Sequence, residues 1–112
     1  MTDEDLVEAL KALAHPVRLR IMQALTRGER NVGEIDEAAA IGQPTLSQQL
    51  AVLRKAGLVD TRKQAKLVYY RIDYDKIGII AGAMGELGGG LGSPMRHARE
   101  TVPGVANFAK LG

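Results

Sequence analysis

Apolar residues recur mostly three or four positions apart through four successive stretches of the chain, the spacing that places side chains on one face of an α-helix. The recurring positions are Leu6, Val7, Leu10 and Leu13; Val17, Ile21, Ala24 and Leu25; Val32, Ile35 and Ala39; and Leu46, Leu50 and Leu53. Boundary signals separate the stretches, because Pro16 suits the first turn of a helix, Asn31 suits an N-cap and Gly42 breaks the pattern. The sequence therefore predicts four helices before residue 58.

The last of these helices, within residues 41–57, also has a polar face. Pro44 suits its first position, and Gly57 suits the position just past its end. Opposite the leucines lie Gln48 and Lys55, with small or uncharged polar groups on the flanks. Such side chains can follow a base edge closely, so this face predicts contact with DNA, and a solvated glutamine-rich surface is the alternative. The candidate contacts on this helix are Gln43, Thr45, Ser47, Gln48, Gln49 and Lys55.

Two β-prone runs over residues 58–72 predict a basic hairpin. Val68, Tyr70 and Ile72 alternate in the second run, which is typical of a strand with one buried face. The tip, residues 63–66, lacks the Asn-Gly pair that favours the tightest turns. A polar-faced helix followed by a basic hairpin is the plan of a winged helix-turn-helix, whose helix enters the major groove and whose hairpin reaches a phosphate strand or the minor groove. The candidate contacts in the hairpin are Arg62, Lys63, Gln64 and Lys66.

Residues 74–87 show helical spacing again, with Ile77, Ile80 and Met84 on one side. An apolar stripe left exposed on a final helix needs a partner. Several glycines and a proline follow it, so we assign residues 1–88 to a DNA-binding and dimerisation domain. Residues 89–112 are assigned to a Gly-rich tail that is either disordered or folded back on the dimer.

Length and composition narrow the class of protein. The 112 residues fit one domain of ordinary hydrophobic content, 46%, with one Phe, three Tyr and no Trp to fill a core, so dimerisation would add a useful buried layer. The absence of cysteine excludes disulfide scaffolds, thiolate zinc sites and cysteine nucleophiles. No stretch approaches the roughly 18 apolar residues of a membrane span, and the acidic start is unlike a signal peptide, so we expect a cytoplasmic protein.

Charge is unevenly distributed, although the formal net charge is only +2. Residues 1–10 carry four acidic and no basic side chains, whereas residues 54–71 carry six basic side chains and one acidic. The basic cluster flanks the polar helix and the hairpin and therefore favours nucleic-acid binding over a merely solvated surface. The only histidines are His15 and His97, and no motif pairs a nucleophile with a base, so the sequence does not predict an enzyme.

Three stretches of the chain carry a family resemblance. They are KALAHPVRLRIMQAL at residues 11–25, VGEI at 32–35, and IGQPTLSQQLAVLRKAGLVDTRK with VYYRI between 41 and 72. Together they resemble the ArsR family of small bacterial repressors. The resemblance implies a mainly α-helical winged helix-turn-helix of five helices and a two-stranded wing, a structural contact between helices for Arg18, and a homodimer formed by the first and last helices. The dimer contacts that it indicates are Leu6, Leu10, Ile77, Ile80, Ala81, Met84 and Leu87.

The sensor residues of that family are missing from this chain. Members linked to sulfide and biofilms sense through two cysteines, the first of which corresponds to Gln23, and arsenic-sensing members carry a Cys-Val-Cys box where this chain has Asn-Val-Gly at 31–33. His97 and Glu100 resemble half of a zinc site that some relatives carry, but a Gly-rich run separates them from the other half. We therefore expect no metal and no cofactor, and an effector that acts without thiols.

The sequence as a whole predicts a homodimeric, sequence-specific transcriptional regulator, most simply a repressor, that binds an inverted-repeat operator. The expected partners are double-stranded operator DNA and a second copy of the chain, with an unidentified small-molecule effector left open. One alternative is a winged-helix protein-interaction module, which Gln48 and the hairpin lysines argue against because protein-binding faces usually carry apolar anchors. The other is a metal-responsive repressor that uses His97 and Glu100.

Overall fold

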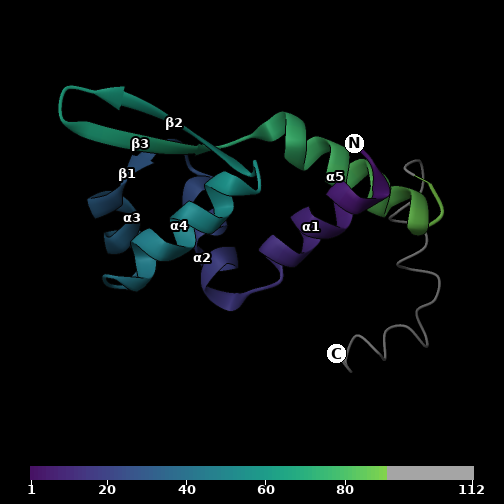
Figure 1. Cartoon of the computed structure of the whole chain (residues 1–112), viewed down its shortest axis with the longest axis horizontal. Coiled ribbons are helices and arrows are strands. Elements are labelled where there is room, and N and C mark those ends of the chain that lie inside the picture. Colours follow the sequence, from purple (N-terminus) through teal and green to yellow (C-terminus); the bar gives the residue numbers. More distant parts are fainter. Residues whose placement is uncertain (91–112) are drawn as a thin grey trace. The chain divides into compact units, whose positions relative to one another are not determined.

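The computed structural model describes residues 1–90 of the chain (Figure 1). Within them lie the expected five helices and the hairpin, together with a short third strand that the sequence did not predict. In chain order the elements are α1 (Asp3–Leu13), α2 (Pro16–Leu25), β1 (Arg30–Asn31), α3 (Val32–Ala39), α4 (Thr45–Lys55), β2 (Val59–Gln64), β3 (Leu67–Ile72) and α5 (Tyr74–Leu87). None of these helices has both the length and the apolarity to cross a membrane.

Side-chain caps fix where the helices begin. Thr2 and Asn31 each form a capping box with the residue three positions later, so that two backbone N–H groups are satisfied at the start of α1 and of α3. The ring nitrogen Nδ1 of His15 accepts from the N–H of Val17 at 3.2 Å, which makes this histidine the N-cap of α2. Pro44 was predicted to be the first residue of α4, but the helix begins at Thr45 and Pro44 is its N-cap.

Three arginines bind carbonyl groups at helix C-termini, where the last carbonyls lack helical partners and the helix dipole is negative. Arg18 donates to the carbonyl of Ala12 in α1 at 2.6 Å. Arg20 donates to the carbonyl of Ala39, the last residue of α3, at 3.0 Å. Arg30 donates to the carbonyl of Ala24 in α2 at 2.8 Å. These bonds tie the ends of the first three helices to other parts of the chain.

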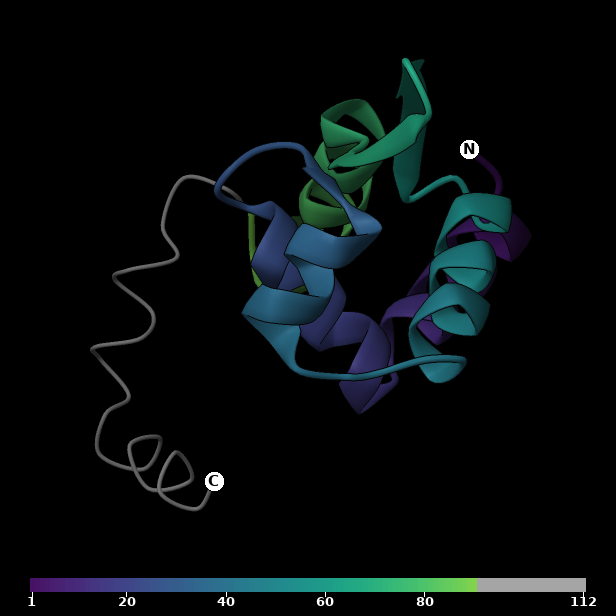
Figure 2. The same ribbon diagram turned by 90° about the vertical axis from the view of Figure 1, so that its left-hand side faces the viewer.

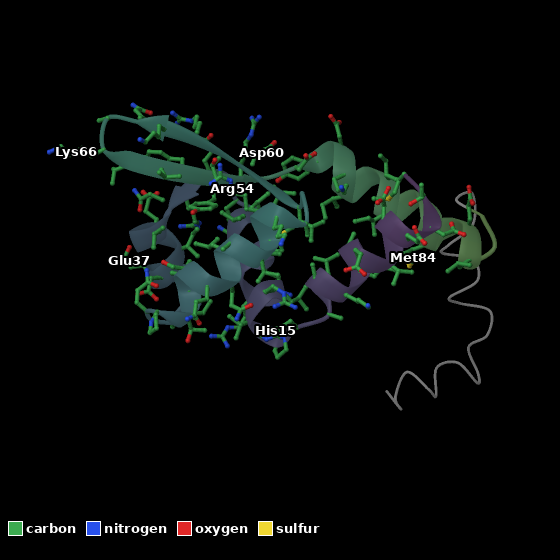
Figure 3. All side chains as sticks on the ribbon, in the orientation of Figure 1. His15, Glu37, Arg54, Asp60, Lys66 and Met84 are labelled. Atoms are coloured by element: carbon green, nitrogen blue, oxygen red, sulfur yellow. The ribbon has the colours of Figure 1, made fainter. Side chains whose placement is uncertain are left out.

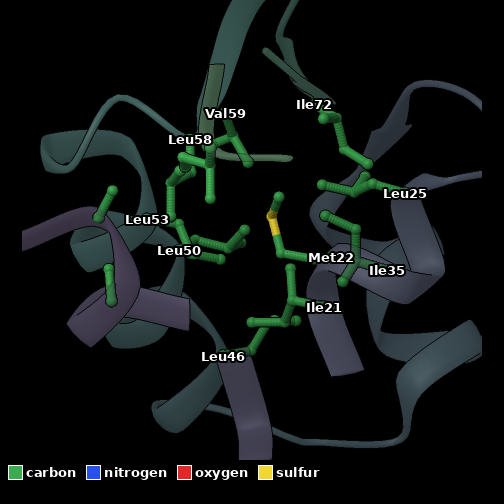
Figure 4. Packing of buried hydrophobic residues seen from close by; sticks show 13 residues of the cluster. Ile21, Met22, Leu25, Ile35, Leu46, Leu50, Leu53, Leu58, Val59 and Ile72 are labelled. Atoms are coloured by element: carbon green, nitrogen blue, oxygen red, sulfur yellow. The ribbon is translucent and has the colours of Figure 1, made fainter. Parts of the chain in front are cut away.

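The core is formed mainly by the inward faces of α2, α3 and α4 with the start of β2 and the end of β3 (Figure 4). Leu46, Leu50 and Leu53 of α4 are 0–1% exposed, as their spacing predicted. Burying a leucine side chain of this kind stabilises the fold by about 1.5 to 3 kcal/mol. The buried set is Ala9, Ala12, Ile21, Met22, Leu25, Ile35, Leu46, Leu50, Leu53, Leu58, Val59, Ile72 and Ile80.

The three strands form one antiparallel sheet in the order β1-β3-β2. In the hairpin Gln64 pairs with Leu67, so Ala65 and Lys66 form a two-residue turn without the Asn-Gly pair that such turns favour. Ala65 adopts a φ of +58°, in the left-handed region that glycine or asparagine usually occupies. The hairpin therefore closes in two residues because Ala65 adopts the left-handed conformation.

The chain divides into two compact units, Met1–Ile80 and Ala81–Gly112. The first unit holds α1 to α4, the sheet and the beginning of α5. Of the second unit, the structure describes the end of α5 and the short turn as far as residue 90. Most of the predicted tail, including His97 and Glu100, lies outside the described residues.

Candidate nucleic-acid interface

Helix α4 presents a polar face to solvent because its three leucines face the core. Thr45, Ser47, Gln48 and Lys55 are all exposed. Among residues 1–90 the side chains of these four make no hydrogen bond and no salt bridge. This face therefore carries hydroxyl, amide and ammonium groups that are available to a partner.

Gln43 lies just before α4 and supports the helix directly. Its Oε1 accepts from the backbone N–H of Ser47 at 3.0 Å, which satisfies one of the donors that a helix start leaves unpaired. Gln43 is also a predicted DNA contact, and that contact stays a prediction. The residue as a whole is exposed, next to the start of the polar face.

Gln49 differs from its neighbours because its side chain is engaged inside the protein. It is half-buried, and its Oε1 accepts from Nη1 of Arg18 at 2.7 Å. Bidentate recognition of adenine by glutamine uses both the amide oxygen and the amide nitrogen. The predicted DNA contact through Gln49 would therefore have to share this oxygen with Arg18 or break the bond between them.

The turn between α3 and α4 is held by a residue that no sequence pattern singled out. Asp36 of α3 accepts from the N–H of Ile41 at 3.2 Å and from that of Gly42 at 2.8 Å through the same oxygen. Ala40 and Gly42 both adopt positive φ, +53° and +84°, which lets the chain reverse in a few residues. Figure 2 shows the resulting arrangement, with α4 beside α1 and α2 packed next to α3.

The hairpin carries exposed cations at its free end. Lys63 and Lys66 are exposed and form no salt bridge with any described residue, and Lys66 lies at the tip (Figure 3). Arg54 at the end of α4 is also exposed. Lys63 and Lys66 are predicted phosphate contacts, and Arg54 is a further exposed cation that the sequence did not assign to DNA. Cationic side chains supply most of the binding energy to a DNA backbone.

Arg62 and Gln64 belong to a polar network within the protein. Arg62 forms a salt bridge of 2.7 Å with Glu29, donates to Oε1 of Gln64 at 2.7 Å, and stacks over the ring of Tyr69 at 4.9 Å. The hydrogen bond from Arg62 lowers the pKa of Glu29 and raises that of Arg62. Arg62 is a predicted DNA contact like Lys63 and Lys66, and in the structure its guanidinium has an anionic partner in Glu29.

The predicted dimer residues divide into two sets. Ile80 is 5% exposed in the core of the first unit, so this assignment to a dimer face needs correction, and Ile77 packs half-buried against the same core. Their spacing on α5 was right, but it serves the fold of the single chain. Leu6 and Leu10 of α1 are also half-buried, and the exposed members are Ala81, Met84 and Leu87.

No cluster of three or more histidine or acidic side chains that could hold a metal occurs within residues 1–90. His15 uses Nδ1 to cap α2, and Gln23 is an exposed residue of that helix. The predicted half-site at His97 and Glu100 lies outside the described part of the chain.

The amino-acid sequence matches a known domain family and several bacterial repressors. A family model described as "Helix-turn-helix domain" matches residues 13–62. A biofilm growth-associated repressor from Agrobacterium fabrum is 57% identical over 67 residues, 60% of this chain and 57% of that protein. The match thus spans little more than half of that relative's length. The protein of the same name from Xylella fastidiosa is 44% identical over 91 residues, 75% of this chain and 80% of that protein.

Solved structures of similar proteins share the fold. The crystal structure of the transcriptional repressor BigR from Xylella fastidiosa matches with a TM-score of 0.61 and 42% identity, over 78% of this chain and 96% of that one. The solution structure of a homodimeric winged helix-turn-helix DNA-binding domain from Mycobacterium bovis, described as a possible ArsR-family regulator, matches with a TM-score of 0.64 and 34% identity, over 72% and 76%. With the polar face of α4 and the basic hairpin, these matches identify the chain as a member of the ArsR family of winged helix-turn-helix transcriptional regulators.

Proposed function

We propose that this protein is a sequence-specific repressor that binds operator DNA as a homodimer. The observation that carries the proposal is the outward face of α4, where Thr45, Ser47 and Gln48 are exposed and have no side-chain partner among residues 1–90, while the leucines of the same helix anchor it in the core. In a helix-turn-helix the second helix lies in the major groove, where such groups meet base edges. The cations of the hairpin then contact phosphates and fix the register.

Dimerisation sets the symmetry of the target. The similar domain from Mycobacterium bovis is described as homodimeric, and α5 of this chain ends in the exposed apolar residues Met84 and Leu87. Two α4 helices related by a two-fold axis would meet two half-sites of an inverted repeat, about one helical turn of 34 to 36 Å apart. A repressor of this kind acts by covering promoter elements.

Regulation of this repressor would not depend on thiols. The chain has no cysteine, and the position at which the family resemblance implies a sensor cysteine holds Gln23, on the surface of α2. We therefore propose an effector that binds by other chemistry, or constitutive repression. A zinc-responsive mode through His97 and Glu100 is the less favoured version, because it supplies two ligands where zinc normally takes four.

The test is selection of duplexes from a random-sequence library, followed by gel-shift titration of the enriched duplex and of a shuffled duplex at several salt concentrations. A sequence-specific dimer yields an enriched inverted repeat, and its affinity for both duplexes falls steeply with salt. A protein-interaction module would enrich no sequence. Weak binding to both duplexes alike would indicate DNA affinity without operator recognition and would contradict the proposal.

A further inference from the structure

Arg18 links three helices through one guanidinium group. From α2, its Nε donates to the carbonyl of Ala12 in α1 at 2.6 Å, and its Nη2 lies 3.4 Å from the carbonyl of Lys11. Its Nη1 donates to Oε1 of Gln49 in α4 at 2.7 Å. A guanidinium has donors only, so the atom of Gln49 that it meets must be the amide oxygen. The end of α1 and the middle of α4 are thereby joined through one side chain.

The bond to Gln49 restrains α4 in a way that its apolar contacts do not. Among the described residues, no other side chain of α4 makes a hydrogen bond to a different helix. Leu46, Leu50 and Leu53 hold the helix by burial, which is favourable but not directional. A hydrogen bond prefers a narrow range of distance and angle. Gln49 lies at the edge of the leucine stripe, where a rotation of α4 about its axis would stretch this bond.

We propose that Arg18 is a positioning residue for DNA recognition, which sets the rotation of α4 through Gln49 and so fixes where Ser47 and Gln48 meet the bases. Gln49 itself then serves as an acceptor for Arg18 and does not contact a base. The inference rests on the proposed function, since it assigns a means of specificity to the same interface. It also means that the C-terminal end of α1 and the recognition helix move together.

Substitutions of Gln49 can distinguish its role as an acceptor for Arg18 from a direct contact with a base. Gln49→Glu keeps an acceptor oxygen for Arg18 and replaces the amide N–H₂, whereas Gln49→Met removes both at similar size. Arg18→Met removes all donors. Arg20→Met is the matched control, because it removes the same charge from the same helix and an arginine bond to a different helix end, that of α3. Arg18 also lines an open groove of about 480 Å³ between α1 and α4, so water can reach the carbonyls that Arg18→Met leaves.

The quantity to measure is the specificity ratio, the affinity for the duplex enriched by the wild-type protein divided by that for its shuffled version. Arg18→Met and Gln49→Met should each lower the ratio about tenfold, the equivalent of one hydrogen bond near 1.4 kcal/mol. The double variant should lower it no further, because the two residues form one contact. Gln49→Glu and Arg20→Met should keep the wild-type ratio, although Gln49→Glu should weaken binding to both duplexes by charge repulsion.

Two results would overturn the role of Arg18 while leaving the proposed function intact. In one, Gln49→Glu loses the ratio as Gln49→Met does while Arg18→Met keeps it, which would make Gln49 a direct base contact. In the other, Arg18→Met weakens binding to both duplexes equally, which would make Arg18 a support for the fold alone. If the wild-type protein enriches no duplex, the proposed function fails and this inference fails with it. If Arg18→Met does not fold, the comparison of Gln49→Glu with Gln49→Met still decides.

Discussion

Arg62 of β2 donates hydrogen bonds to both carboxylate oxygens of Glu29, at N···O distances between 2.7 and 2.9 Å. Glu29 precedes β1, so the pair joins the hairpin to the segment that follows α2. The same guanidinium stacks on Tyr69 of β3. The guanidinium of Arg62 is therefore committed to an anion of the same chain, which a DNA phosphate would have to replace.

The first prediction is that Glu29→Gln raises the affinity for any duplex. Removing the carboxylate frees Arg62 to pair with a phosphate, which should also make the dependence of log affinity on log salt steeper by roughly one unit. Fluorescence anisotropy with a shuffled duplex at a series of salt concentrations measures both effects. Glu37→Gln is the control, because Glu37 is exposed on α3 and makes no salt bridge with a described residue. An equal rise in that variant would assign the effect to net charge alone.

The second prediction concerns how the stability of the folded protein depends on pH. The hydrogen bond from Arg62 holds the pKa of Glu29 below its ordinary value of 4.5, so the pair stabilises the folded protein fully above that value. As pH falls through the lower pKa of the folded state, Glu29 becomes protonated and the stabilisation is lost. Urea unfolding midpoints of the wild type and of Glu29→Gln should therefore differ at pH 7 and converge as the pH falls below 4.5. If the difference between the two midpoints is the same at every pH tested, the ion pair of Glu29 and Arg62 does not contribute to stability.

The third prediction is that Gln48→Ala costs about 1 to 3 kcal/mol of binding to the enriched duplex and leaves binding to a shuffled duplex nearly unchanged. Gln48 lies at the centre of the exposed face of α4 and has both amide atoms free to pair with adenine. Thr45→Ala and Ser47→Ala should follow with smaller losses. Equal weakening on both duplexes would rule out a base contact for Gln48.

The fourth prediction concerns the lysines of the hairpin. Lys63→Ala and Lys66→Ala should each weaken binding to every duplex and flatten the salt dependence by roughly one unit, since each phosphate contact releases counterions. Sequence preference should survive. Lys11→Ala removes an exposed lysine from α1, a helix with no predicted DNA contact, and should leave the slope unchanged. If the variant with both lysines replaced keeps the wild-type dependence of affinity on salt, the hairpin does not contact the DNA phosphates.

Helical spacing was sufficient to predict the helices of this chain, because apolar residues at every third or fourth position form one continuous face only when the backbone is helical. The leucines of α4 are the clearest case, and all three are buried as expected. Polar pairs distant in sequence carry no such periodicity. The bond from Arg18 to Gln49 spans 31 positions and that from Arg62 to Glu29 spans 33, so the sequence could not show these partners, and the DNA contacts of Gln49 and Arg62 stay predictions. Strand β1, with two residues, is too short to show a pattern.

The apolar stripe of α5 shows a second limit of periodicity, since spacing identifies a buried face and not what covers it. Ile80 is 5% exposed within the single chain, whereas Met84 is 36% and Leu87 81% exposed. An aspartate at Ile80 would place a charge in the core of the chain itself and should cost several kcal/mol of folding stability. Ile80→Asp should therefore unfold the protein and cannot report on the dimer.

The fifth prediction is that Met84→Asp separates the dimer without unfolding the chain. An aspartate in an apolar seam between two copies would be buried without a partner, but the same residue in a free monomer is solvated. Sedimentation velocity should show a monomer with the helical circular dichroism of the wild type, and affinity for an inverted repeat should fall because both half-sites are no longer bound together. Ile79→Asp is the control, since Ile79 is 51% exposed on the opposite side of the same helix. A dimer that persists in Met84→Asp and dissociates in Ile79→Asp would place the seam on the other face of α5.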